Sequence, residues 1–170
     1  GASIFNLGCK CAPCKENYLK KEMTASLAVS YLTDASSDMY NRLLSEGIIN
    51  ATFGGEVFSG DGFFSVILSG ESENPDAVRA AVIAEIKRIS EEGIDERTFN
   101  RIKKATYGDL VRQLCNVTSF ASVMINSHMA GCKPFDIVDI VSELTAVDAL
   151  NFIKNELIPE RIVLSVIEKI

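Results

Sequence analysis

The chain has 170 residues, of which 47% are hydrophobic and 24% charged, and its 17 basic and 23 acidic side chains leave a net charge of −6. This length and composition are typical of one compact domain with a sizeable core, and they exclude a disordered segment. The acidic balance lacks the basic surface that nucleic acid or an anionic membrane would require. No apolar stretch reaches the ~20 residues that span a bilayer, so we expect neither nucleic acid nor membrane as a partner.

Cysteine usage indicates the redox compartment. The five cysteines are an odd number spread along the chain, which argues against a complete disulfide framework and for reduced thiols. No charged region followed by an apolar region opens the sequence, as it would in a secretory signal. We therefore expect a cytoplasmic protein.

The first third of the chain predicts a strand and two helices. Residues 3–10 alternate weakly, with Ile4 and Leu7 as the apolar anchors of a strand. Residues 15–33 place apolar side chains four positions apart, which predicts a helix with one buried face. Ser36 and Ser37 can cap a second, short helix that a glycine at position 47 would end.

A hairpin should follow, because from residue 48 the apolar period changes to two and residues 59–62 supply a turn. Its phenylalanines, at positions 53, 58, 63 and 64, should lie mostly in the core. Alternate residues of a strand must nevertheless face the other side of the sheet, and an apolar face left uncovered there would be a binding surface.

The second half of the chain predicts a helical series and a closing strand. Two helices joined through residues 93–94 should form an antiparallel pair, and residues 117–130 should form another helix. Pro134 can open a further helix, Thr145 and Asp148 resemble a capping box for the last one, and residues 161–167 read as a strand. This order predicts an α+β fold, with a mostly antiparallel sheet and helices packed on one face, in a single domain over residues 1–170.

A cluster of thiols near the start, Cys9, Cys11 and Cys14, is the sharpest local candidate for chemistry. Thiolates this close can share a soft metal such as zinc, although a closed zinc site needs a fourth ligand from far away in the sequence. Cys11 and Cys14 could also act as a redox pair. The remaining alternative is that all three are ordinary thiols.

Other catalytic patterns lack the necessary residues. His128 is the only histidine, so a zinc site that needs two histidines, or a serine or cysteine nucleophile with a histidine base, has too few candidates. The glycines around the hairpin do not follow the spacing of a phosphate-binding loop and are better explained as turn and bulge residues.

Several segments in a fixed order resemble the second domain of the pitrilysin/insulinase family of zinc peptidases. The first is Ser-Ser-Asp-Met-Tyr-Asn-Arg-Leu-Leu at residues 36–44 with Glu-Gly-Ile-Ile at 46–49, which is similar to the family's Ser-Ser-x-Leu-Phe helix and Gly-Leu step. Further similar segments lie at residues 69–76, 91–94, 99–104, 135–136 and 144–148. The likeness spans nearly the whole chain.

The resemblance implies a domain without the catalytic metal. In this family the zinc site, His-x-x-Glu-His with a distal Glu, lies in the first domain, so zinc is expected only in an N-terminal domain missing from this sequence. The second domain closes a chamber and offers an edge strand and an apolar wall to extended peptides. The implied partners are that N-terminal domain, a second subunit in a homo- or heterodimer, and a peptide substrate.

The family's substrate-contacting Arg and Tyr fall at Leu44 and near Asn50, so neither is present here. By the same resemblance, the polar residues nearest the chamber wall are Ser37, Tyr40, Arg42 and Asn50.

The leading hypothesis is a non-catalytic chamber or substrate-binding domain, the C-terminal half of a longer two-domain subunit of a zinc metallopeptidase. A domain of a catalytically inactive partner subunit is the second hypothesis. A thiol or metal-binding module that uses Cys9, Cys11 and Cys14 is the third.

Overall fold

The computed structural model describes residues 2–14, 16–129 and 131–168, and it has the predicted α+β architecture. The elements follow in the order β1 (Ser3–Cys11), α1 (Tyr18–Thr33), α2 (Asp38–Ser45), β2 (Gly54–Gly60), β3 (Phe63–Ser72), α3 (Pro75–Glu92), α4 (Glu96–Cys115), α5 (Val117–Met129), α6 (Asp136–Glu143), α7 (Ala146–Glu156), a 3₁₀ turn (Pro159–Arg161) and β4 (Ile162–Ile167). The helix predicted from residue 15 begins at Tyr18, and Lys15 itself lies outside the described residues. No helix in the described ranges is long and apolar enough to cross a membrane.

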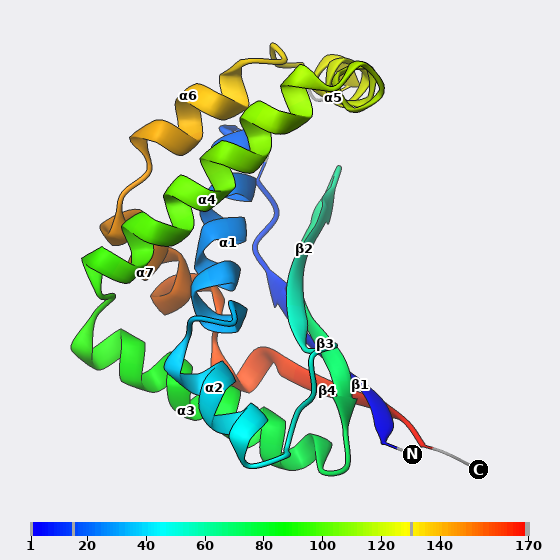
Figure 1. Cartoon of the computed structure of the whole chain (residues 1–170), viewed down its shortest axis with the longest axis vertical. Coiled ribbons are helices and arrows are strands. Elements are labelled where there is room, and N and C mark those ends of the chain that lie inside the picture. The colour runs from blue at the N-terminus through cyan, green and yellow to red at the C-terminus, as the bar shows by residue number, and fades with distance from the viewer. Residues whose placement is uncertain (1, 15, 130, 169–170) are drawn as a thin grey trace.

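The four strands form one antiparallel sheet in the order β2-β3-β1-β4. The first strand of the chain is therefore central, with Leu7 opposite Leu68 of β3 on one side and Leu164 of β4 on the other. Figure 1 shows α1 lying along one face of this sheet, with α4, α6 and α7 in a further layer behind it. Helices thus cover one face of the sheet, as predicted.

The core lies between the sheet and α1. Alternate residues of β1 are buried, beginning with Phe5 and Leu7, and the same period buries Phe64 and Leu68 of β3. The two apolar anchors predicted for this strand lie on opposite faces, because Leu7 is buried whereas Ile4 is 47% exposed on the other face, in register with Ile167. Burial follows the alternation that starts at Phe5, since successive strand side chains point to opposite faces.

One glycine allows α1 to approach the edge of the sheet. A Cβ atom at Gly55 would lie 2.5 Å from Cγ1 of Val29 and 2.6 Å from Cδ2 of Leu68. Only a residue without a side chain leaves room for this contact between α1 and β2.

Side-chain caps begin five of the helices in the described ranges, and the sequence predicted those at Ser37 and Thr145. Ser37 accepts a hydrogen bond from the backbone N–H of Tyr40, and equivalent bonds begin α3, α4 and α7 at Asn74, Asp95 and Thr145. At α5 the side-chain oxygen of Asn116 accepts a hydrogen bond from the backbone N–H of Ser119 at 3.0 Å. α7 begins with a complete capping box, because the carboxylate of Asp148 in turn accepts a hydrogen bond from the backbone N–H of Thr145 at 2.8 Å. These bonds satisfy N–H groups that the first turn of a helix leaves free.

The capping box at α7 should make stability depend on pH. A hydrogen bond from the Thr145 hydroxyl holds the pKa of the Asp148 carboxyl below its ordinary value. The ionised Asp148 carboxylate therefore contributes its full stabilisation above about 3.9, the ordinary pKa of an aspartate in an unfolded chain. This contribution is lost as the pH falls through the lower pKa that Asp148 has in the folded chain. We expect Asp148→Ala to reduce the free energy of unfolding by about 1 kcal/mol at pH 7, and the difference from the native chain to shrink below pH ~4, in urea titrations at several pH values. A difference that stayed constant down to pH ~2 would show that the carboxylate does not act through its charge.

Candidate functional site

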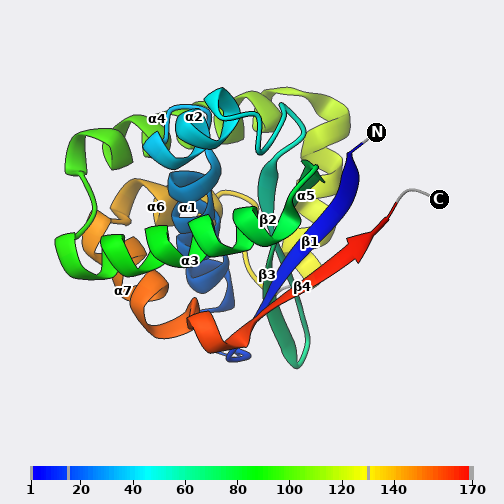
Figure 2. The same ribbon diagram turned by 90° about the horizontal axis from the view of Figure 1, so that it is seen from below.

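The face of the sheet that turns away from α1 is the largest open apolar surface on the strands. The exposed apolar side chains on it come from all four strands: Ile4 (47% exposed), Phe58 (58%), Phe63 (39%), Val163 (68%) and Ile167 (63%). Figures 1 and 2 show the helices that contact the sheet gathered on its opposite side. We call this surface the open face.

An aromatic pair stands at the hairpin end of the open face. The ring centroids of Phe58 and Phe63 lie 5.2 Å apart, and the ring of Phe63 fills the space where Gly60 would carry a side chain. Phe53 and Phe64, in contrast, are buried. The expectation that these phenylalanines lie mostly in the core therefore holds for only two of the four, because Phe58 and Phe63 occupy the strand positions that face away from the helices.

The middle of the open face is shallow. Gly8 of β1 lies between Ile67 of β3 and Val163 of β4, and no atom comes within 4 Å of the position that a Cβ would take there. Polar side chains flank this point, because Asn6 is paired with Ser69 and Ser165. The open face therefore combines an unobstructed glycine floor with apolar groups at both ends.

Two of the residues proposed from the resemblance lie in the core. Ser37 donates a hydrogen bond to the carbonyl oxygen of Leu32 at 3.1 Å while it caps α2, and it is buried. Tyr40 is only 8% exposed, and its ring centroid is 6.2 Å from that of Phe53. Both side chains thus have packing and capping contacts that account for their positions.

The other two proposed residues are nearer the surface. Arg42 is exposed on α2. Asn50 lies in the loop before β2, where it donates a hydrogen bond to the carboxylate of Glu71 at 2.8 Å and accepts one from the Thr52 hydroxyl at 2.5 Å. Within the described part of the chain, only Ser37 and Tyr40 of the four are joined to each other by a hydrogen bond.

The three clustered thiols do not converge on one point. Cys9 and Cys11 are buried, and their sulfur atoms both donate to the carbonyl oxygen of Glu156, at 3.5 and 3.9 Å. Cys14 instead donates to the carbonyl oxygen of Glu16 at 2.6 Å. A hydrogen bond with Cys11 lowers the pKa of the Cys9 thiol, and the same bond with Cys9, together with burial, raises the pKa of Cys11. Across the described residues, no three His, Cys, Asp or Glu side chains are placed to hold a metal ion.

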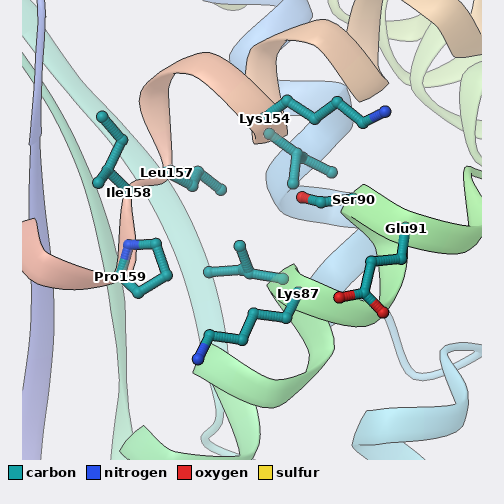
Figure 3. Close-up of a pocket in the computed structure, with 9 residues that line it drawn as sticks. Lys87, Ser90, Glu91, Lys154, Leu157, Ile158 and Pro159 are labelled. Carbon is teal, nitrogen blue, oxygen red and sulfur yellow. The ribbon is translucent and has the colours of Figure 1, made fainter.

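The hollow between α3 and α7 lacks convergent chemistry. A cavity of about 190 Å³ lies between α3 and the end of α7, with Ser90 and Glu91 on one side and Leu157 and Pro159 on the other. Figure 3 shows the ammonium ends of Lys87 and Lys154 on opposite sides of it, pointing away from each other. These groups do not form an acid–base pair or an ion-binding cluster.

The donor set does not fit a catalytic zinc ion. Such a site takes three protein ligands, usually including at least one histidine, and the single histidine here, His128, is exposed on α5. A helix-backed antiparallel sheet with an open apolar face defines a domain of the α+β class. The chain belongs to the M16 peptidase family: residues 10–106 match the family model described as the Peptidase M16 inactive domain.

A curated relative gives the scale of the longer proteins in this family. The chain is 24% identical over 144 residues to the uncharacterized zinc protease YmfH of Bacillus subtilis, and the match covers 85% of this chain and 33% of that protein. The chain therefore spans about a third of the length of this relative. The match relates the chain to zinc proteases and confirms the pitrilysin-type resemblance seen in its sequence.

Solved structures share the fold. An M16-like peptidase from Alicyclobacillus acidocaldarius gives a TM-score of 0.89 at 19% identity, over 97% of this chain and 40% of that one. The inactive peptidase domain of a Bordetella parapertussis zinc protease gives 0.81 at 12%, over 100% and 92%. A chain of Complex III2 from Candida albicans gives 0.78 at 13%, over 96% and 42%. At these identities the similarity shows the fold alone, and it shows that the fold occurs in longer chains and in a multisubunit assembly.

The sequence singled out Phe58 and Phe63 of the open face, as hairpin phenylalanines on a face that would bind if left uncovered, but the other residues of this face were not proposed as a site. Ile4, Gly8, Val163 and Ile167 carry no chemical motif that would single them out. The available signal was the alternation of buried residues from Phe5 to Cys11, which assigns Ile4 and Gly8 to the opposite face of β1.

Proposed function

We propose that this chain is the non-catalytic, substrate-binding wall of the chamber of an M16 zinc peptidase, and that its open face receives an extended peptide. The single observation that carries the proposal is that the sheet is covered by helices on one face only, while apolar side chains stand exposed on the other. Exposed apolar surfaces of this kind mark interaction sites.

The shape of the open face suits an extended chain. Its glycine floor at Gly8 leaves room for a backbone beside Val163, and the aromatic pair Phe58–Phe63 and the aliphatic pair Ile4–Ile167 lie at its two ends. Apolar side chains of a peptide can bury area at both ends without a requirement for one sequence. Bond cleavage would belong to a zinc-bearing domain outside this chain, since the residues described here provide no donor set for it.

The proposal places the chain within a larger subunit. The Bacillus subtilis relative and the Alicyclobacillus acidocaldarius structure are longer by a factor of about two to three, so we take residues 1–170 as one domain, the C-terminal half of a two-domain subunit. Its immediate partner would be the N-terminal domain. The free cysteines at positions 9, 11, 14, 115 and 132 support a cytoplasmic location.

A substitution at Gly8 tests the open face directly. Gly8→Leu adds a side chain into free space, so we expect the fold to be kept and the affinity for a fluorescein-labelled nonapeptide of alternating Leu and Lys to fall about tenfold, measured by fluorescence anisotropy. Gly108→Leu is the matched control, because Gly108 lies on α4 with only Arg112 at 4.0 Å from its added Cβ. No binding by the native chain, or equal binding by both variants, would reject the open face as the peptide site.

A domain of an inactive partner subunit is the second candidate function. It is favoured by Leu44 and Asn50, which stand where the resemblance places the substrate-contacting Arg and Tyr, and by the engagement of Asn50 with Glu71. Mixing the chain with its cognate N-terminal half and measuring both association and peptide hydrolysis separates the two. Association with hydrolysis supports the chamber wall, and association without hydrolysis supports the partner subunit.

A further inference from the structure

The sheet has a free edge at β4. This strand pairs with β1 alone, so within residues 162–167 the backbone groups on its other side have no strand partner. At the start of the strand, Nη2 of Arg79 donates to the carbonyl oxygen of Ile162 at 3.4 Å. The stretch from Val163 onward is the part of this edge that is open to another strand.

The composition of β4 suits pairing. Its sequence, Ile-Val-Leu-Ser-Val-Ile, contains no charge, proline or glycine. Proteins normally protect an exposed edge with charged side chains, proline, bulges or very short strands. The opposite edge, β2, has such features, since it carries Glu56 and the glycines at positions 54, 55 and 60.

We propose that β4 is a dimerisation edge, and that two copies of this chain pair their β4 strands in antiparallel fashion with Ser165 opposite Ser165. A twofold axis perpendicular to the sheet keeps the helices of both copies on the same side of the joined sheet. Residues that lie opposite each other across the two β4 strands must therefore both point to the open face or both point to the helices. With Ser165 on the axis, Val163 of each copy lies opposite Ile167 of the other copy, which makes two such pairs on the open face. These are its most exposed aliphatic side chains, at 68% and 63%.

The alternative symmetric register is less favourable. With Leu164 on the axis, Val163 would face Ser165, and Ile167 would face Arg161 of the other copy. Cross-strand pairs of β-branched residues stabilise a sheet by about 0.2–1 kcal/mol each. Each register gains two such pairs, Val163 with Ile167 when Ser165 is on the axis and Ile162 with Val166 when Leu164 is on the axis. The second register depends on Ile162, whose carbonyl oxygen already accepts a hydrogen bond from Arg79. Because β4 itself is uncharged, no like charges meet along this edge.

Two other ways to pair this edge would give a different association state in solution. Pairing of β4 with β2 of another copy would be head-to-tail and would form open chains of copies instead of closed dimers. An added peptide strand would leave the protein monomeric. The pairing of two copies does not rest on the proposed function, because it requires the free backbone edge of β4 and does not require a peptide bound to the open face.

Cysteine substitutions test the register. We use a background in which Cys14, Cys115 and Cys132 are replaced by serine, which leaves the buried Cys9 and Cys11. Opposite Cβ atoms of an antiparallel pair lie about 4.5–5.5 Å apart, close enough for a disulfide after small adjustments. After oxidation with diamide, Ser165→Cys should give a covalent dimer on a non-reducing gel. Val163→Cys and Ile167→Cys alone should not, whereas the double variant Val163→Cys/Ile167→Cys should.

The mass in solution tests the dimer itself. The native chain should approach twice 18.5 kDa in sedimentation equilibrium at tens of micromolar, and Val163→Lys should shift it to a monomer with an unchanged circular dichroism spectrum. Phe58→Lys, on β2, is the matched control and should remain dimeric. A monomeric native chain, a dimer that Val163→Lys leaves intact, larger open-ended species, or equal cross-linking at positions 163 and 165 would each overturn the proposal.

Discussion

Replacing Phe64 with alanine is expected to lower the free energy of unfolding by about 3–5 kcal/mol, a large part of the roughly 5–15 kcal/mol that stabilises an ordinary domain. Phe64 is completely buried, and its ring centroid lies 6.2 Å from that of Phe152 on α7. The ammonium nitrogen of Lys21 on α1 lies 5.0 Å from the centre of the same ring. One side chain of β3 thus joins the sheet to two helices, and its removal leaves a cavity at that junction.

Phe63→Ala is the control for this prediction. Phe63 is the preceding residue on the same strand, but it is 39% exposed on the open face, where it contacts Phe58. Its truncation should remove about 1 kcal/mol or less. Guanidinium titrations of both variants measure the difference. Similar losses for the two would mean that the open face is covered in the folded chain, contrary to the arrangement described above.

The helices could be predicted well because their signals are local. Ser37 and Thr145 each cap the helix that the sequence assigned to them, since a cap depends on residues three positions away. The hairpin was predictable for the same reason, from the change in apolar period and the turn at residues 59–62. The α+β class followed from the order of these elements.

The faces of the first strand were harder to assign. Residues 3–10 contain apolar side chains in both phases, and Ile4 resembles Phe5 in hydrophobicity. Only the neighbours of β1 in the sheet, which come from β3 and from β4 at the other end of the chain, decide which phase is buried. This information lies in tertiary pairing, which local periodicity does not contain.

The candidate site was also beyond local patterns. The four polar residues proposed near α2 came from resemblance, and two of them, Ser37 and Tyr40, have roles in capping and packing here. The open face is instead made by residues without a motif, brought together by the sheet. Likewise, no sequence spacing relates the thiols of β1 to Glu156, because more than a hundred residues separate them.

Glu156 forms the second junction of the fold, and Glu156→Gln is expected to lower the free energy of unfolding by about 2 kcal/mol. Its carboxylate pairs with Lys21 and accepts a hydrogen bond from the backbone N–H of Ala12 at 2.8 Å. The Lys21 and Glu156 side chains are only 17% and 16% exposed. Loss of one partner from a fully buried pair costs about 3–5 kcal/mol, and partial exposure reduces that value. Urea titration at pH 7 measures the effect.

A double-mutant cycle assigns this loss to the ion pair. Once Glu156 is neutral, Lys21→Met removes a poorly solvated charge that has lost its partner, so the double variant should recover about 1–2 kcal/mol relative to the sum of the single changes. The surface pair of Asp109 and Arg112 provides the control, because these side chains are 59% and 74% exposed. Asp109→Asn should change stability by about 0.5 kcal/mol or less. Additive single effects at Lys21 and Glu156 would show that the two charges contribute independently, and that the tie between β1, α1 and α7 depends on the hydrogen bond to Ala12.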